Sequence, residues 1–223
     1  MHSGTCREDK EVLVDVSIGG AVDIAGYRGD GLTLTLAGLQ FETTADIALV
    51  VPGGTTIVLE GGENRLAVQA LGADANAAVL YSQGDLTITG GEGKLICDAT
   101  KTVADNCTWS RGICARYGDL TVSGGHVEVH CGDCSRRAGA YYAGGRLYGG
   151  DAQKGAITIT GGTLAGTSIH NVIRATEGQL TIGAGSKVEN SNEFSGSAEE
   201  WHGSFLDQAD KSKPAVITFK TDN

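Results

Sequence analysis

The sequence predicts an all-β protein, a single-stranded right-handed parallel β-helix, and a recurring phrase is the main reason. The phrase at residues 84–91 reads Gly-Asp-Leu-Thr-Ile-Thr-Gly-Gly. Close copies of it start at Gly118 and Gly155, and a more divergent copy starts at Gly178. Each copy alternates apolar and small polar residues and closes on glycine, which is typical of a strand followed by a turn. With 35 glycines, 2 prolines and few aromatic residues, the chain favours thin aliphatic layers. A strand that recurs in one phase indicates a stacked repeat.

The spacing of the phrases gives the length of one coil. Their first apolar residues are 34, 37 and 23 residues apart. The shortest step suits three short strands and three turns, which is one rung of a parallel β-helix, and the longer steps then carry inserted loops. We expect two inward columns of stacked side chains. The first is Leu86, Leu120, Ile157 and Leu180, and the second is Ile88, Val122, Ile159 and Ile182.

The other elements follow in order along the chain. Residues 32–36 and 55–62 read as earlier coils. A second strand follows the phrase at residues 94–97 and 126–131. A third strand precedes it, and its copies align position for position at residues 78–81, 112–115, 140–143 and 172–175. Near the end, Trp201 and Phe205 lie four residues apart, which predicts a short amphipathic capping helix before a last strand at 215–220.

We expect a single domain over residues 1–223. The open ends of a β-helix expose strand edges and need covers. The expected parts are an N-terminal cap or lead-in (1–17), the coils (18–190) and a C-terminal cap (191–223). Inserts at the corners of the coils mark one face as the binding face. They occupy residues 98–111, 132–138 and 144–154.

Composition limits the classes of binding partner and the cellular compartment that we expect for this protein. The 17 basic and 27 acidic residues give a net charge of −10, so no basic stripe is present to neutralise nucleic-acid phosphates. No apolar run approaches the ~20 residues that a membrane-spanning helix needs. Six cysteines in a chain rich in Gly and Thr fit an oxidising compartment. We therefore expect a secreted or cell-surface protein whose signal peptide is absent from this chain.

The cysteines predict disulfides. Cys97 and Cys131 each follow the second glycine of a phrase by six residues. In register they would lie ~4.8 Å apart, inside the ~4.4–6.8 Å range of disulfide-linked Cα atoms. A zinc site built from Cys131, Cys134 and either His126 or His130 is the weaker interpretation, because a lone CxxC has no second pair. The disulfide candidates, with no fixed connectivity, are Cys97, Cys107, Cys114, Cys131 and Cys134.

Polar residues of the phrase give two further predictions. The threonines that alternate with the inward residues should face solvent and stack from rung to rung, as Thr87, Thr121, Thr158 and Thr181 do in the alignment. Threonine is a good strand former, although a flat threonine array also resembles ice-binding surfaces on other β-solenoids. Asp85 and Asp119 would lie ~4.8 Å apart and could share a cation. The favoured interpretation is an Asp at a turn that bonds the backbone two residues on.

Two segments carry a resemblance to a known family. The phrase Gly-Asp-Leu-Thr-Ile-Thr-Gly-Gly, preceded by residues 77–82, and the segment 57–66 match in the right order. Over roughly residues 18–190 the chain resembles secreted bacterial carbohydrate-binding domain proteins with a pectate-lyase-like, right-handed parallel β-helix. The resemblance implies binding of plant-type or acidic polysaccharide or cell-wall glycan without cleavage, with calcium as a cofactor in some members.

Aromatic and basic residues gather in or beside the inserts. Aromatic rings stack on the apolar faces of sugars, and arginine pairs with carboxylates. Tyr142 and Arg174 also share the column of Cys114, so we expect them to lie side by side. For each aromatic taken singly, filling a corner is an equal alternative. The expected ligand-binding residues are Trp109, Arg116, Tyr117, Tyr142 and Arg174.

The sequence thus favours a non-catalytic extracellular polysaccharide-binding module, monomeric or part of a larger surface protein. A polysaccharide lyase or hydrolase on the same fold is the first alternative. The threonine face weighs against it, because short hydroxyls can neither hold a cation nor act as a base toward a uronate. A structural or adhesive repeat module is the second alternative.

Overall fold

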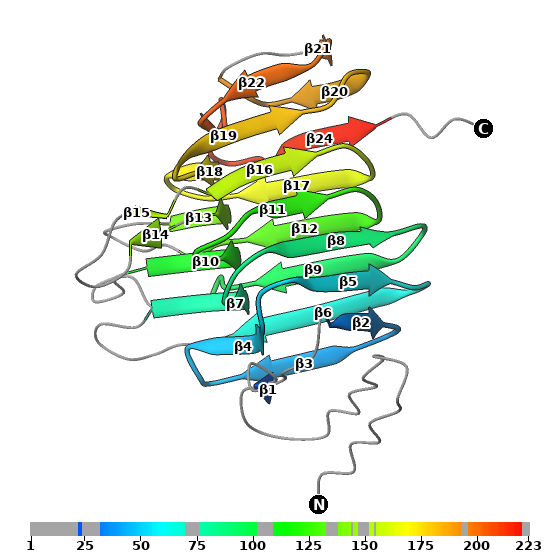
Figure 1. The fold of residues 1–223 in the computed structure, drawn as a ribbon, viewed down its shortest axis with the longest axis vertical. Coiled ribbons are helices and arrows are strands. Elements are labelled where there is room, and N and C mark those ends of the chain that lie inside the picture. Colours follow the sequence, from blue (N-terminus) through cyan, green and yellow to red (C-terminus); the bar gives the residue numbers. More distant parts are fainter. Residues whose placement is uncertain are drawn as a thin grey trace, which may run out of the picture.

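The structure, a computed structural model, describes residues 22–23, 32–69, 76–101, 109–132, 138–143, 145–146, 152–153, 155–192 and 196–219. Every regular element within these ranges is a β-strand, and the strands form three long sheets that are mostly parallel (Figure 1). The fold is therefore all-β, as the sequence predicts. None of the described segments forms a helix long and apolar enough to cross a membrane.

From residue 22 to residue 189, successive long strands visit the three sheets in rotation. The first sheet holds β2 (Thr33–Leu36), β5 (Thr55–Leu59), β8 (Leu86–Gly90), β11 (Leu120–Val122), β16 (Gly155–Ile159), β19 (Glu177–Ile182) and β22 (Trp201–Gly203). The second holds β3 (Gln40–Thr43), β6 (Glu63–Val68), β9 (Lys94–Asp98), β12 (His126–His130), β17 (Thr163–Thr167), β24 (Ala215–Phe219), β20 (Ser186–Glu189) and β21 (Gly196–Ala198). The third holds β1 (Val22–Asp23), β4 (Ile47–Val51), β7 (Asn76–Ser82), β10 (Trp109–Ala115), β13 (Ala138–Ala143), β18 (Asn171–Ala175) and β23 (Phe205–Leu206).

The core runs between the sheets and consists of stacked aliphatic columns. Both predicted columns are confirmed: Leu120 pairs with Leu86 and with Ile157, and the register continues through Leu180. All eight side chains in the two columns are at most 1% exposed. Because alternate residues of each strand point inward, similar aliphatic side chains stack from strand to strand and build a continuous core.

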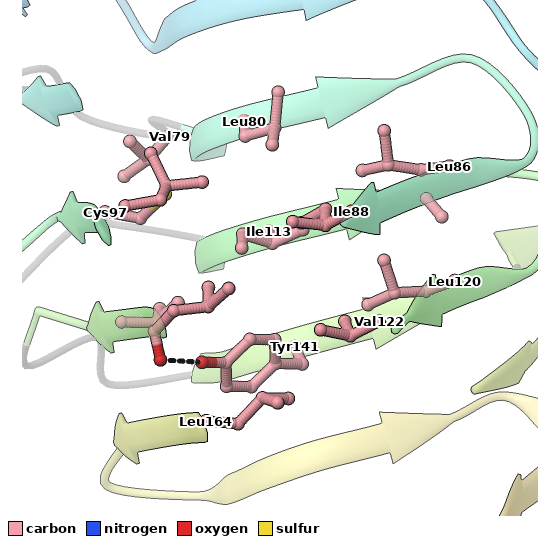
Figure 2. Close-up of a cluster of buried hydrophobic side chains, with 14 of the residues drawn as sticks. Val79, Leu80, Leu86, Ile88, Cys97, Ile113, Leu120, Val122, Tyr141 and Leu164 are labelled. Carbon is pink, nitrogen blue, oxygen red and sulfur yellow. Dashed lines mark hydrogen bonds between the residues drawn. The ribbon is translucent and has the colours of Figure 1, made fainter. Parts of the chain in front are cut away.

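One aromatic side chain crosses this core. Tyr141 of β13 is 1% exposed, and its hydroxyl lies 3.0 Å from both the Val127 and the Ala165 carbonyl oxygens, on β12 and β17. Figure 2 shows the ring among Val122, Leu164 and other core side chains, with its hydroxyl directed at the neighbouring sheet. A buried tyrosine hydroxyl needs a hydrogen-bond acceptor, and here it ties the third sheet to the second.

The C-terminal segment differs from the prediction of a helix. Trp201 and Phe205 lie in β22 and β23, which pair antiparallel with β19 and β18, and β24 pairs antiparallel with β17. The open edges of β18 and β19 present unpaired backbone groups, so strand pairing satisfies more hydrogen bonds there than a short helix would. Phe205 accordingly remains 44% exposed, while Leu206 next to it is fully buried against Ile173.

A small hairpin interrupts the rotation between β13 and β16. It consists of β14 (Gly145–Arg146) and β15 (Ala152–Gln153), which pair antiparallel. In Figure 1 it lies beside β13 and β10, on the side of the third sheet. The expected insert at 144–154 is thus partly a hairpin, and it lies on the face where the sequence gathers its aromatic and basic residues.

Candidate functional site: an aromatic and arginine corner beside the third sheet

The corner that joins β10 to β11 is one residue longer than the corner that joins β7 to β8. Residues 83–85 join β7 to β8, whereas residues 116–119 join β10 to β11. The additional residue is accommodated at Tyr117, which has a φ of 67°. A left-handed conformation costs a residue other than glycine about 1–2 kcal/mol. The corner therefore carries strain at the position where it presents an aromatic ring.

This additional residue also explains why the alignment of the third strand predicted from the sequence is wrong by one position at residues 78–81. Counted back from the phrase, residues 78–81 would lie opposite 112–115. The structure instead pairs Leu80 with Ile113 and Tyr81 with Cys114, one position further along. The other copies of the third strand align as expected, because Cys114 pairs with Tyr142 and Tyr142 with Arg174.

Arg116 lies directly on the strained tyrosine. Its guanidinium carbon is 5.0 Å from the centroid of the Tyr117 ring, within the range of a cation–π contact. Burial disfavours the charged guanidinium and tends to lower the pKa of Arg116. The hydrogen bond and charge interaction with Tyr117 outweigh this effect, so the pKa of Arg116 is raised. The Nε of Arg116 is buried and has no hydrogen-bond acceptor among the described residues. Such an orphaned donor costs about 1–3 kcal/mol, so this geometry is not one that maximises stability.

Tyr81 completes the corner, a place that was not predicted for it from the sequence. Burial raises the pKa of the Tyr81 hydroxyl, with Cys114 and Tyr117 adding to the rise while Arg116 and Arg111 oppose it. Tyr81 pairs in register with Cys114, and the Arg116 backbone N–H donates to the carbonyl oxygen of Ser82, the residue after Tyr81, at 2.8 Å. Tyr81 could have been found from its place one rung before Cys114, but the shifted alignment hid it. We call Tyr81, Arg116 and Tyr117 the aromatic corner.

From this corner, the column of residues next to the inward-facing column of Ile113 and Tyr141 continues along the third sheet. In register it runs through Val50, Tyr81, Cys114, Tyr142, Arg174 and Phe205. The prediction that Tyr142 and Arg174 lie on adjacent strands is confirmed. Arg174 is exposed, whereas Cys114 is fully buried. Trp109 is the first residue of β10, opposite Asn76, so it begins a strand and does not lie within a loop.

The basic residues of the third sheet differ from those of the second. On the second sheet, Arg65 pairs with Glu42 and Asp98, and Lys94 with Glu63 and Glu128. Neither Arg116 nor Arg174 forms an ion pair with another described residue. These two guanidinium groups thus lie outside the ion pairs of the described residues, in a protein with a net charge of −10.

The carboxylates of Asp85 and Asp119 each accept a hydrogen bond from a backbone N–H. The Asp119 backbone N–H donates to Asp85 Oδ1 at 2.9 Å, and the Ala156 backbone N–H donates to Asp119 Oδ1 at 2.8 Å. Each carboxylate thus bonds the next rung, and not its own backbone two residues on as expected. No group of three or more His, Cys, Asp or Glu side chains that could hold a metal ion occurs in the described part of the chain.

The threonine column is longer than predicted. Thr87, Thr121, Thr158 and Thr181 lie in register on neighbouring strands, as expected. Thr56 and Thr33 extend the column across β5 and β2. The column stands on the first sheet, around the corner from Tyr81, Arg116 and Tyr117, and gives a separate face on which to test binding.

The predicted register of Cys97 and Cys131 is wrong. Cys97 lies opposite Val129, because residues 92–93 lengthen the turn before β9. Cys131 then lies two residues further along, which puts the two Cα atoms about 8 Å apart, beyond the ~6.8 Å limit for a disulfide. Cys97, Cys114 and Cys131 are not in disulfides, and Cys97 and Cys114 are fully buried. Cys107 and Cys134 lie outside the described residues, as does part of the zinc candidate.

Comparison with known proteins adds no further information: no protein-family model, no curated protein and no solved structure matches this chain.

Proposed function

We propose that this protein is an extracellular module that binds an acidic polysaccharide at the aromatic corner and does no chemistry on it. The observation that carries the proposal is the pair Arg116 and Tyr117, held with strain and with an orphaned donor at one lengthened turn. Unfavourable local geometry persists where the surrounding structure maintains it, and it gathers at ligand sites. An arginine on a tyrosine ring offers a cation for a carboxylate and an apolar surface for a sugar face.

We also propose that the scaffold is a right-handed parallel β-helix, as the resemblance implies. The rotation of strands through three parallel sheets, in register over successive rungs, supports this. A rigid scaffold of this kind holds side chains of neighbouring rungs ~4.8 Å apart without loop motion. That favours recognition of a long regular ligand over a small compact one.

The proposal is tested by titrating the protein with polyuronates in a calorimeter, alongside a uronate cleavage assay. We expect binding without release of unsaturated or reducing ends. Affinity should fall as salt rises, since exposed charge pairs are screened beyond ~10 Å at 0.1 M. Arg116→Ala, Tyr81→Ala and Tyr117→Ala should each weaken binding in a folded protein, because these three residues form the aromatic corner.

Thr87→Ala is the matched control, because it changes the threonine column and leaves the aromatic corner intact. Unchanged affinity in the first three variants would refute the assigned site. Loss of binding in Thr87→Ala would move the site to the first sheet. Product release in the cleavage assay would favour the lyase or hydrolase alternative. The absence of any glycan binding would favour the structural or adhesive module.

A further inference from the structure

The turn between β10 and β11 is held at both ends by the rung before it. At its first residue, the Arg116 backbone N–H donates to the Ser82 carbonyl oxygen at 2.8 Å. At its last residue, the Asp119 backbone N–H donates to Asp85 Oδ1 at 2.9 Å. Tyr117, with its φ of 67°, lies between these two fixed points. A side chain of the preceding rung, the carboxylate of Asp85, therefore takes part in closing the strained turn.

Asp85 can act as a clamp because its own position is fixed. Its backbone carbonyl oxygen accepts the Gly54 N–H at 2.8 Å and the Ser82 hydroxyl at 3.2 Å, and Ser82 is fully buried. Gly118 packs directly against the carboxylate, since a Cβ at this position would lie 2.6 Å from Asp85 Oδ1. The carboxylate thus has little room to move away from the Asp119 N–H.

The charge of Asp85 works against the ligand that we propose. Its side chain is exposed and belongs to the turn that follows Tyr81 on β7. A carboxylate there repels the carboxylates of a polyuronate, because like charges held close together disfavour each other. A group of this unfavourable sign beside the aromatic corner is accounted for by its role as a hydrogen-bond acceptor for the turn.

We infer that Asp85 is a positioning residue for the binding site: its carboxylate holds the turn that keeps Tyr117 left-handed and Arg116 over its ring. This inference rests on the proposed function and adds a residue that acts through Tyr117 and not on the ligand itself. Without the clamp, Tyr117 relaxes toward the negative φ that residues other than glycine prefer. Apparent affinity falls with the fraction of molecules that keep the binding conformation, here about tenfold.

The test is calorimetric titration with polygalacturonate and with polymannuronate, in EDTA so that no divalent cation bridges the ligand to a carboxylate. Asp85→Ala removes both the charge and the acceptor, and we expect it to weaken binding about tenfold. Asp85→Asn removes the charge but keeps Oδ1 as an acceptor, so it should bind as tightly as wild type or more tightly. Simple charge repulsion predicts the opposite sign for Asp85→Ala, which makes this variant decisive.

Asp119→Ala is the matched control. It removes the same charge one rung on, where the carboxylate accepts the Ala156 N–H, and it leaves the Asp119 N–H bonded to Asp85. Its affinity should stay within about twofold of wild type, because single exposed charges contribute little.

Hydrogen–deuterium exchange without ligand measures the clamp directly. The Asp119 amide should exchange faster in Asp85→Ala than in wild type, because the substitution removes its acceptor. In Asp85→Asn, which retains the acceptor, the same amide should exchange at close to the wild-type rate. Circular dichroism checks that each variant is folded.

Each outcome bears on a separate claim. Binding by Asp85→Ala equal to or tighter than that of wild type, with the Arg116→Ala effect retained, would overturn the positioning role and leave the proposed function in place. Weakened binding by Asp85→Asn would also overturn that role, because the charge and not the acceptor would then matter. No binding of either polyuronate to wild type would refute the proposed function, and the exchange of the Asp119 amide would still decide whether Asp85 holds the turn.

Discussion

Asn64 should be among the most sensitive polar residues in the protein. Its side chain is fully buried near the start of β6 and bonds β2, β9 and the turn between β2 and β3. Oδ1 accepts the Leu39 backbone N–H at 2.9 Å, and Nδ2 donates to the Leu36 and Lys94 carbonyl oxygens at 3.3 and 3.1 Å. Asn64→Ala removes all three bonds at once, on both neighbouring rungs.

The expected loss of stability follows from the hydrogen bonds that each backbone partner of Asn64 keeps after the substitution. The Leu39 N–H loses its acceptor, and a donor left unsatisfied costs about 1–3 kcal/mol. The Leu36 carbonyl still accepts the Glu60 N–H, so its loss is small, and the Lys94 carbonyl loses a bond worth about 1 kcal/mol. We expect Asn64→Ala to lower the free energy of unfolding by about 3 kcal/mol, which moves a urea midpoint by about 1 M.

The assay is equilibrium urea unfolding followed by circular dichroism. Gln40→Ala is the matched control: its amide is exposed on the neighbouring strand and donates one hydrogen bond, to the Glu63 carbonyl oxygen, so the change should stay within about 0.5 kcal/mol. Asn64→Asp keeps the acceptor for Leu39 but cannot donate, and it should also be destabilised. An Asn64→Ala midpoint equal to that of wild type would refute the reasoning.

Three further outcomes follow from the structure. Val122→Asp buries an unpaired charge between rungs and should leave the protein insoluble or unfolded by circular dichroism; a native spectrum would contradict the predicted core. Gly118→Ala would bring a Cβ to 2.3 Å from the Asp85 backbone nitrogen and should cost about 2–3 kcal/mol in urea, whereas Gly61→Ala meets no atom within 4 Å and should be neutral. The hydrogen bond from Lys94 lowers the pKa of Glu128, so its contribution to stability is present above about pH 4.3 and is lost as the pH falls through the lowered value. Glu128→Gln should therefore flatten the acid side of the stability–pH curve, and an unchanged slope would contradict this.

The repeated phrase was enough to predict the core but not the corners. Alternation fixes which residues of a strand face inward, so the columns of Leu120 and Val122 could be read from sequence. Turn lengths follow no such period. The additional residue at Tyr117 shifted the alignment of the third strand and so concealed Tyr81. The two additional residues at 92–93 mean that Cys97 lies opposite Val129 and not opposite Cys131, as the alignment predicted.

The C-terminal end shows a second limit of sequence reasoning. The spacing of Trp201 and Phe205 suits a helix when taken alone. The partner strands β19 and β18 decide otherwise, because their edges need hydrogen bonds from the segment that covers them. The same pairing brings Phe205 beside Arg174, which no local pattern could have indicated.

The most direct test of the proposed function is hydrogen–deuterium exchange measured with and without a saturating polyuronate. We predict slower exchange of the backbone amides at residues 83–85 and 116–119, which form the turns beside Tyr81, Arg116 and Tyr117. Amides that flank the threonine column, at Thr56 and Thr87, should exchange at the same rate in both samples. Protection confined to the threonine column, or no protection at either face, would contradict the assignment of the site.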